Sequence, residues 1–374
     1  MNPVYITKSA AITPMGPDLE SLYTDLINKK SGINKITRFN TLHYTSPFAG
    51  VIAGLDHTKR LPLIFQLSDM LTEQLGPIEN DTFMISASTK AGIDMLEKNT
   101  VESKLLSKDL LLSSLTEYIA LKLRLNNKGI NINSACASST IAVAKAASLI
   151  QTGVVDSVLI CCMDIVSQFV FSGFSALGAM SDEPARPFDK NRKGLTLGEG
   201  AAAILLMNKE KVKASGIAPL AEITGWGIAN DATHLTAPDK NGSGLKLAIG
   251  KACKKAKIST DAIYAVNSHG TGTVYNDSME INVIRSMFNS NQVIANSIKG
   301  SIGHTLGAAG GIEIALCTKM LQKEIMPGTF GFLDPENGAE QIISPDARSL
   351  KGDYILTTNS GFGGTNAAII LKKV

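Results

Sequence analysis

Short apolar runs alternate with longer helical patterns along this chain, and that alternation constrains its fold more than any other feature. The apolar runs are rich in β-branched and aliphatic residues, and four of them lie at 83–86, 157–161, 201–206 and 367–371. Four helical patterns lie at 136–152, 242–256, 278–288 and 307–323. Strands that alternate with helices in this way are typical of layered α/β proteins. We therefore expect an α/β fold.

No low-complexity linker divides the 374 residues, which are enough for one large domain or two ordinary ones. The best candidate for a boundary within the chain is the polar, charged stretch NKEKVKASGI at 208–217, which follows a run that resembles a buried strand. No sequence repeat is visible, so an internal duplication would be one of structure alone. With 44% hydrophobic and 18% charged residues, the composition indicates a well-buried globular protein rather than a disordered one.

Charge and hydropathy argue against several classes of protein. The formal net charge of +3 is too small to predict nucleic-acid binding and is compatible with an acidic protein partner. The first residues, MNPVYITKSAAITPMG, show no basic segment followed by an apolar one, so we expect no secretory signal. Since no stretch of about 18 consecutive apolar residues occurs, we also expect no membrane span.

The cysteines, histidines and glycines argue against disulfides, metal sites and nucleotide sites. Five cysteines form an odd set without a CxxC pair, so a disulfide framework or a zinc site is a poor interpretation and a reducing cytosol a better one. The histidines are scattered and include no HExxH motif, so we expect no metal. The glycine clusters match neither a phosphate loop nor a dinucleotide fingerprint.

Cys136 stands at a predicted turn between a strand and a helix. The strand-like segment INI precedes it at 130–132, and apolar residues recur at helical spacing after it until Gly153. A thiol at a helix N-terminus is stabilised as a thiolate, which would lower its pKa from about 8.5. A small buried core cysteine is an equally good interpretation of this segment alone.

Three further segments place reactive side chains beside glycines. His269 ends an apolar run and begins a Gly/Thr turn, although a lone histidine of this kind is more often structural. Lys299 and His304 lie five residues apart in a glycine-rich loop, where Lys299 alone would usually be a solvated surface residue. Glycines also surround Phe362, which indicates a mobile flap or a backbone held close to a ligand. A tight turn with a core phenylalanine is the alternative there.

Taken together, these segments resemble the β-ketoacyl synthases, the condensing enzymes of fatty-acid and polyketide assembly. The closest type is the elongating one that uses a Cys-His-His triad. The similar motifs run through nearly the whole chain: ITPMG, SACASS, RPFDKNRKGLTLGEGAA (186–202), NDATHLTAP (230–238), NSHGTGT, IKGSIGHTLGAAGGIE and GFGGTN.

The resemblance implies a role for each matching residue. Cys136 matches the acyl-accepting cysteine, His269 and His304 the two catalytic histidines, and Lys299 their supporting lysine. The backbone N–H groups of Cys136 and Phe362 match the oxyanion hole, and the Phe362 ring matches an aromatic gate over the acyl pocket. Other positions match with supporting roles: Thr271 and Thr273 for the phosphopantetheine arm, Glu313 as a buried glutamate behind the site, and Asn366 in the terminal glycine loop.

The reaction implied has two halves. An acyl chain first moves from a carrier-protein thioester to Cys136, which suits a thiolate nucleophile. Malonyl carrier protein then loses carbon dioxide, and two imidazole N–H donors can hold the enolate that forms. The expected partners are acyl carrier protein in both forms and a second subunit, in a homodimer or a heterodimer with a related synthase. The family needs no cofactor of its own, since the phosphopantetheine arm arrives on the carrier, and works in the cytoplasm.

The family's architecture implies a thiolase-like fold, a five-layer α-β-α-β-α sandwich of two similar halves. Residues 1–210 would form the half that carries the nucleophilic cysteine. Residues 211–374 would form the half that carries the histidines, the lysine and the glycine-rich loop. The site would lie at their junction.

Some departures and rival interpretations stay open. The segment before Cys136 is roughly two dozen residues shorter than expected of an elongating enzyme, Ser360 replaces a second phenylalanine, and Tyr275 stands where a small residue is common. These departures suit a specialised polyene or polyketide synthase about as well as a housekeeping fatty-acid enzyme. Rival interpretations are a non-catalytic chain-length factor, a thiolase-type or starter-unit synthase acting on coenzyme A thioesters, and a purely structural protein.

Overall fold

The computed structural model describes residues 2–98, 108–288 and 292–374, which form one ten-stranded sheet and two small ones. The large sheet consists of two groups of five strands. From its centre outwards, the first group runs β1 (Val4–Ile12), β8 (Gly200–Asn208), β6 (Ser157–Asp164), β4 (Phe83–Ala87) and β5 (Ile130–Ile132). The second runs β9 (Ala221–Asn230), β15 (Thr365–Lys372), β14 (Tyr354–Gly361), β10 (Ile263–Asn267) and β11 (Ile294–Asn296).

The two groups repeat one pairing pattern. From β1 outwards the first two pairings are antiparallel and the next two parallel, and the same holds from β9 outwards. A short antiparallel contact, Tyr5 with Glu222 and Ile6 with Ala221, joins β1 to β9. The polar stretch between the groups forms α7 (Lys209–Ser215), which begins at the cap Asn208 and ends at left-handed Gly216.

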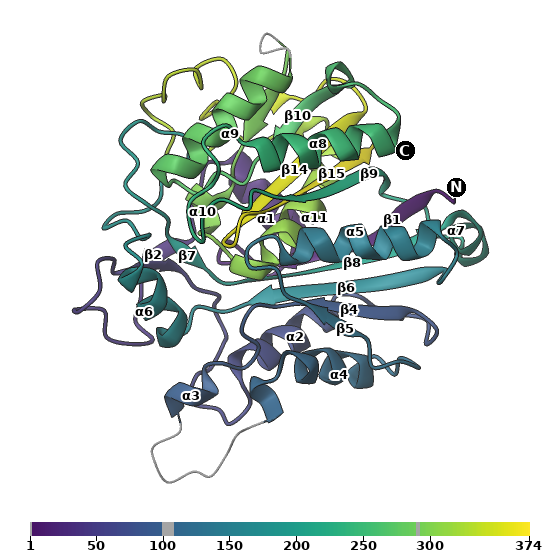
Figure 1. Cartoon of the computed structure of the whole chain (residues 1–374). Coiled ribbons are helices and arrows are strands. Elements are labelled where there is room, and N and C mark those ends of the chain that lie inside the picture. The colour runs from purple at the N-terminus through teal and green to yellow at the C-terminus, as the bar shows by residue number, and fades with distance from the viewer. Residues whose placement is uncertain (1, 99–107, 289–291) are drawn as a thin grey trace.

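Helices form three layers around the two strand groups (Figure 1). The central layer holds α1 (Leu19–Ile27), α5 (Ser138–Gln151) and α11 (Ala309–Lys323). One outer layer holds α2 (Leu63–Glu73) and α4 (Leu112–Lys122), and the other α8 (Ser243–Ala256) and α9 (Val274–Met287). The arrangement is α-β-α-β-α, which confirms the expected five-layer fold.

Small residues let the central helices pack closely between the strands. Strands β6 and β8 are buried on both faces, as their continuous apolar runs predict. A Cβ on Gly311 of α11 would lie 2.1 Å from Cys162 Sγ, and one on Gly310 would lie 1.9 Å from Thr140 Oγ1 of α5. Glycine is therefore required at these two positions, because α11 touches α5 and β6 there.

Two small sheets and three short helices complete the described structure. They are the three-stranded sheet of β2 (Ile33–Lys35), β3 (Phe48–Gly50) and β7 (Leu197–Gly198), the two-stranded sheet of β12 (Ile325–Met326) and β13 (Arg348–Ser349), and the helices α3 (Met95–Lys98), α6 (Gln168–Ala176) and α10 (Lys299–Ile302). Arg38 forms a buried ion pair with Glu199, whose carboxylate also accepts the backbone N–H groups of Ile52 and Val166. This pair holds the small sheet against the segment that follows β6.

The predicted helices and strands are all present, with shifted ends. Helix α9 begins at Val274, four residues before the predicted 278–288, because its first turn exposes Val274 and Tyr275 and buries polar residues, so it shows no apolar face. A short 3₁₀ turn, Leu306–Ala308, overlaps the start of the predicted 307–323, and α11 follows it. In the part of the chain that the structure describes, no helix is both long and apolar enough to cross a membrane.

Candidate active site

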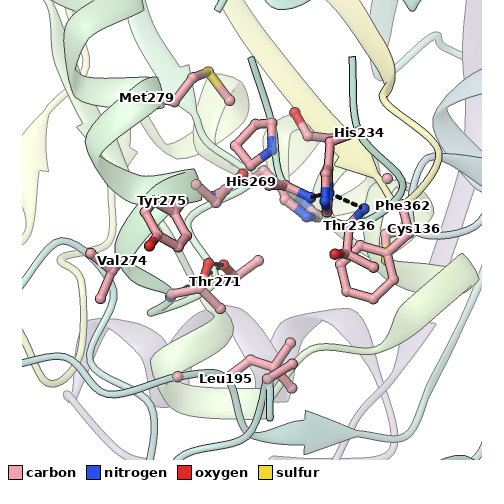
Figure 2. A pocket seen from close by; sticks show the side chains of 18 of the residues that line it. Cys136, Leu195, His234, Thr236, His269, Thr271, Val274, Tyr275, Met279 and Phe362 are labelled. Carbon is pink, nitrogen blue, oxygen red and sulfur yellow. Dashed lines mark hydrogen bonds between the residues drawn. The ribbon is translucent and has the colours of Figure 1, made fainter. Parts of the chain in front are cut away.

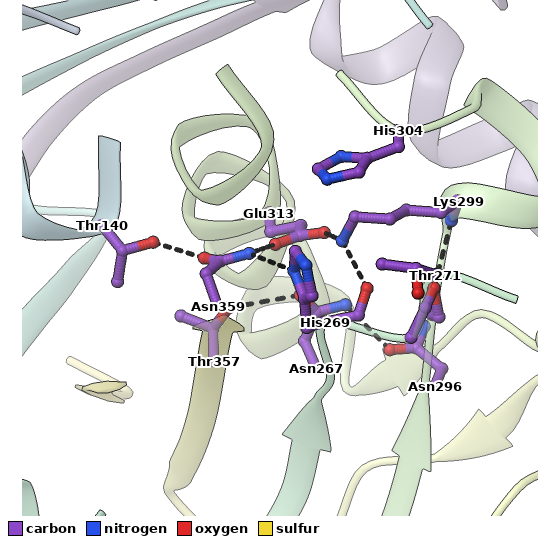
Figure 3. A network of polar contacts seen from close by, with 12 residues as sticks. Thr140, Asn267, His269, Thr271, Asn296, Lys299, His304, Glu313, Thr357 and Asn359 are labelled. Atoms are coloured by element: carbon purple, nitrogen blue, oxygen red, sulfur yellow. Dashed lines mark hydrogen bonds and ion pairs between the residues drawn. The ribbon is translucent and has the colours of Figure 1, made fainter. Parts of the chain in front are cut away.

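A cavity of about 910 Å³ opens between the two strand groups and collects most of the predicted site residues. Cys136, His269, His304 and Phe362 line its inner end. Thr271, Thr273 and Asn366 line it as well. Figure 2 shows Val274 and Tyr275 across the cavity from Cys136 and Phe362. Lys299 and Glu313 do not line the cavity and lie behind the histidines (Figure 3).

Cys136 lies in a tight turn between β5 and α5, as its sequence context predicts. Ala135 holds a left-handed conformation with φ 48°, and the N–H of Ala137 donates to the carbonyl of Ser134 at 3.1 Å. Helix α5 begins two residues later at Ser138, whose hydroxyl accepts the N–H of Ser134 at 2.8 Å. Backbone conformation therefore positions the thiol, which is only 6% exposed.

The pKa expected for this thiol from its helix N-terminus is wrong. Burial raises the pKa of Cys136 to about 11 from the usual 9.0, although the charge of Lys299 and the backbone N–H of Phe362 act in the opposite direction. The physical reason is that removing a thiolate from water costs more free energy here than the charge of Lys299 and the N–H of Phe362 recover. Near pH 7 the group is therefore a neutral thiol.

The two histidines meet edge to face in front of the thiol. Their ring centroids are 5.2 Å apart at an interplanar angle of 85°, and one nitrogen of each ring and Cys136 Sγ all lie within 4.8 Å of one another. Burial, followed by the positive charge of Lys299, holds the pKa of both rings well below the usual 6.5. Both are therefore neutral near pH 7, and each carries one ring proton.

Hydrogen bonds behind the rings determine where that proton lies. The N–H of Leu306 donates to Nδ1 of His304 at 3.3 Å, and the side-chain amide nitrogen of Asn359 lies 3.3 Å from Nδ1 of His269. An amide nitrogen of either kind only donates, so each Nδ1 accepts. Each Nε2 then carries the proton, and the pair supplies two N–H donors.

Cysteine and two histidines are also ligands that zinc accepts. A histidine that binds a metal normally donates its other ring N–H to a carboxylate or carbonyl. Here the second nitrogen of each ring faces a donor, Asn359 in one case and Leu306 in the other. The surroundings thus fit two neutral N–H donors and do not fit a metal ligand set.

Lys299 is buried, so its interpretation as a surface lysine is wrong. Its ammonium donates to Glu313 Oε1 and to the carbonyl of His269, both at 2.5 Å, and Lys299 and Glu313 are each 1% exposed. Burial raises the pKa of Glu313, and the charge of Lys299 opposes that rise. The other carboxylate oxygen accepts from Asn359 at 2.7 Å (Figure 3). The pair brings a fixed positive charge close to both histidines.

The glycine segment around Phe362 is the turn of a hairpin between β14 and β15, with Gly363 and Gly364 in left-handed conformations. A Cβ on Gly361 would lie 3.1 Å from the carbonyl oxygen of Ser134 and 3.2 Å from the nitrogen of Cys136. The backbone at Gly361 is thus held close to Cys136. The Phe362 ring stacks on Phe174 of α6 with centroids 5.8 Å apart.

Polar residues organise the outer part of the cavity. The hydroxyls of Thr271 and Thr273 are 2.9 Å apart, and buried Asp277 accepts the N–H of Thr271 at 3.0 Å. Asn366 accepts from the Ser360 hydroxyl at 2.7 Å and donates to Asp231 at 2.9 Å. The glycine turn is therefore tied to the loop that follows β9.

Several residues of this site were missed from the sequence. Asn359 and Thr140 complete the network behind His269, Phe174 packs against the expected gate, and His234 accepts the N–H groups of Thr236 and Ala237 through Nδ1 at the cavity wall. The sequence held one sign of Asn359, because an amide side chain there lies in a strand that is mostly buried and ends at the glycine turn. Nothing in the sequence around Phe174 indicates its contact.

Two protein-family models and a relative of similar length match the sequence of this chain. A family model described as the N-terminal domain of beta-ketoacyl synthase matches residues 82–212, and one described as its C-terminal domain matches residues 220–333. A 3-oxoacyl-[acyl-carrier-protein] synthase 2 from Vibrio harveyi is 30% identical, with 99% of this chain and 98% of the relative covered.

Solved structures resemble the chain along its whole length. The ishigamide ketosynthase/chain length factor superposes with a TM-score of 0.90 at 24% identity, covering 100% of this chain and 99% of that one. A type II polyketide ketosynthase solved in complex with its acyl-carrier protein superposes with a TM-score of 0.90 at 24% identity, covering 100% of both chains. At 24% identity, these two structural similarities establish the fold alone.

Proposed function

The chain belongs to the β-ketoacyl synthase family, and on this premise we propose that it joins acyl and malonyl groups brought by a carrier protein, in a decarboxylative condensation. It is an acyltransferase of the 3-oxoacyl-[acyl-carrier-protein] synthase type. The observation that carries this proposal is the meeting of Cys136, His269 and His304 within 4.8 Å in one cavity. The buried pair of Lys299 and Glu313 behind them supports the same roles.

In the loading half-reaction, Cys136 Sγ attacks the carbonyl carbon of the acyl thioester. The new carbon–sulfur bond replaces the one to the carrier, and the proton of the Cys136 thiol ends on the leaving carrier thiol. The N–H groups of Cys136 and Phe362 would hold the oxyanion, which the close approach of Gly361 to the Cys136 nitrogen supports. The Phe362 N–H and the Lys299 charge favour the thiolate as it forms.

In the condensing half-reaction, the malonyl group loses carbon dioxide and negative charge develops on its thioester oxygen. The two Nε2–H donors of His269 and His304 would hold that enolate. Its carbanion then attacks the acyl carbonyl on Cys136, so a carbon–carbon bond forms and the bond to sulfur breaks. The β-ketoacyl product stays on the carrier, and Cys136 takes up a proton again.

The outer cavity suits the carrier's arm. Thr271 and Thr273 offer hydroxyls to the amides of phosphopantetheine, and the side chains of Lys193 and Lys240 line the same cavity and suit an acidic carrier protein. Because the arm arrives on the carrier, the enzyme needs no cofactor of its own. Glu313 and Asn366 support the lysine and the glycine turn respectively.

The proposal also covers the boundary between the two halves, the oligomeric state, the cellular location and one alternative function. The boundary between the halves falls near residue 210, which the repeated pairing pattern supports. The protein works as a homodimer or as a heterodimer with a related subunit, in the cytoplasm, where five unpaired cysteines are stable. A non-catalytic chain-length factor is the alternative function. The meeting of all the reactive residues in one cavity favours the catalytic one.

Intact-protein mass spectrometry tests the proposal. The pure protein is incubated with carrier proteins that bear acyl chains of different length and saturation, and we expect an acyl mass gain that Cys136→Ala abolishes. Cys253→Ala is the matched control, since Cys253 lies in the outer helix α8. The preferred chain separates a housekeeping role from a specialised polyene or polyketide role. No gain with any donor, while an added partner subunit becomes loaded, would establish the chain-length factor instead.

A further inference from the structure

We propose that Asn359 is a positioning residue that holds His269 in the tautomer that donates from Nε2, and that Thr140 keeps Asn359 in the required orientation. The inference rests on the proposed function, because it assigns the residue that prepares one of the two enolate donors. Asn359 belongs to β14 and is fully buried. It does not line the cavity, so it acts through His269 and not on substrate.

Three side chains surround the Asn359 amide (Figure 3). Its Nδ2 donates to Glu313 Oε2 at 2.7 Å and lies 3.3 Å from Nδ1 of His269. Its Oδ1 accepts from the hydroxyl of Thr140. The amide has two N–H groups, so one serves the carboxylate and the other serves the ring.

The orientation of the amide follows from what its neighbours can offer. The Glu313 carboxylate, which pairs with the Lys299 ammonium, accepts hydrogen bonds, so the amide nitrogen must face it. The oxygen then faces Thr140, whose hydroxyl must donate. With the nitrogen fixed in this direction, Nδ1 of His269 meets only a donor, and a proton on Nδ1 would oppose it. The ring proton therefore stays on Nε2, where the enolate forms.

Thr140 links this network to the nucleophile. It lies in the first turn of α5, four residues after Cys136, whereas Asn359 and His269 come from the second strand group. A Cβ on Gly310 would lie 1.9 Å from Thr140 Oγ1 and 2.5 Å from Asn359 Oδ1, so glycine alone leaves room for this contact. One chain of hydrogen bonds thus sets the helix of the nucleophile against the donor histidine.

The decisive variant is Asn359→Asp, which keeps the shape and replaces the NH2 group, with both of its N–H donors, by a carboxyl oxygen. A carboxyl group at this position cannot donate to both Glu313 and His269, and an ionised one draws the ring proton to Nδ1. The lone pair of Nε2 would then face the enolate. Decarboxylation of malonyl carrier protein is measured in a Cys136→Gln background, where the carboxamide stands in for the acyl group. Loading is measured with Cys136 intact.

We expect Asn359→Asp to lower decarboxylation by about 10²-fold or more, as for other lost oxyanion donors and wrong tautomers, and loading by less than about tenfold. Nitrogen-15 NMR of labelled histidines should show the His269 proton on Nε2 in the unaltered protein and on Nδ1 in the variant. Equal loss of both steps, or an Nε2 proton in both proteins, overturns the proposal.

Thr140→Val is the milder variant if Asn359→Asp does not fold. It removes the hydroxyl that orients the amide, and we expect decarboxylation to fall by about threefold to tenfold with loading unchanged. Thr357→Val is its matched control. Thr357 is a buried threonine on β14, the strand that carries Asn359, and its hydroxyl donates to Asn267 and not to Asn359. A Thr140 effect no larger than the Thr357 effect overturns the link. If the unaltered protein neither loads nor decarboxylates, the proposed function fails, and the tautomer comparison still decides the role of Asn359.

Discussion

Cys136 and the two histidines are held in place by different means. Backbone conformation and close contact position Cys136: a left-handed Ala135 shapes its turn and Gly361 approaches its nitrogen. Side-chain hydrogen bonds and a buried ion pair position His269, through Asn359 and the carbonyl contact of Lys299. The thiol side of the site is a steric arrangement, and the histidine side is an electrostatic one.

Because the two sides are held differently, substitutions near Cys136 and substitutions near the histidines should have different effects. Changes of size should act on Cys136 and its turn, while changes of charge or hydrogen bonding should act on the two histidines. It also separates the two half-reactions, because loading depends mainly on the thiol side and decarboxylation on the histidine side. Variants that affect both half-reactions equally would break the comparison.

The largest selective effect is expected from His304→Ala. It removes one of two N–H donors to the enolate, so decarboxylation should fall by about 10²- to 10³-fold while loading of Cys136 falls much less. Carbon dioxide release and acyl mass gain measure the two steps separately. A parallel loss of both would show that His304 has a general structural role and that the two sides are not separable.

Lys299→Met should cost stability as well as activity. It leaves the Glu313 carboxylate buried without its cation, and breaking a buried pair in this way costs about 3–5 kcal/mol of unfolding free energy. Urea denaturation measures the loss. Lys128→Met is the control, since Lys128 forms only an exposed pair with Glu117 and should leave the midpoint unchanged. Equal midpoints for both variants would contradict the electrostatic account.

A pair of glycine substitutions tests how much close packing at the start of α11 contributes to stability. Gly310→Ala places a Cβ 1.9 Å from Thr140 Oγ1 and should destabilise the fold by about 1–3 kcal/mol through overpacking. Gly250→Ala is the matched change in α8, where a Cβ meets nothing within 4 Å. There we expect a gain of about 0.5–1 kcal/mol from helix propensity. Thermal unfolding distinguishes them, and equal shifts would count against close packing at α11.

The smallest effect expected is that of pH. Because burial raises the pKa of Cys136 to about 11, iodoacetamide labelling of the free enzyme should keep rising with pH beyond 9.0. The thiol contributes stability that is complete below pH 9.0 and is lost as the pH rises towards about 11. The histidines have the opposite sign: their depressed pKa values cost stability as the pH falls below 6.5. A labelling plateau below pH 9.0 would restore the helix-dipole interpretation of the thiol.

Much of the fold and most of the site could be predicted from the sequence, for identifiable reasons. The alternation of apolar runs and helical patterns predicts the α/β layers, because burial requires that periodicity. Cys136 at a strand-to-helix turn and His269 at a strand end were located by local pattern. Glycines with small neighbours marked the close approach at Gly361. Each of these is a property of a few consecutive residues.

What only the tertiary structure decided depends on residues far apart in the chain. Lys299 is a buried ion-pair partner and not a surface lysine because Glu313 lies 14 positions later on a packed helix. The thiol is neutral because distant segments exclude water from it. The tautomer of His269 depends on Asn359, which lies 90 positions later, and the orientation of Asn359 depends on Thr140, which lies 219 positions before Asn359. The sequence by itself determined which reactive groups exist and in what local geometry. Their charge and proton positions were decided by folding, because burial and hydrogen bonding belong to the assembled site.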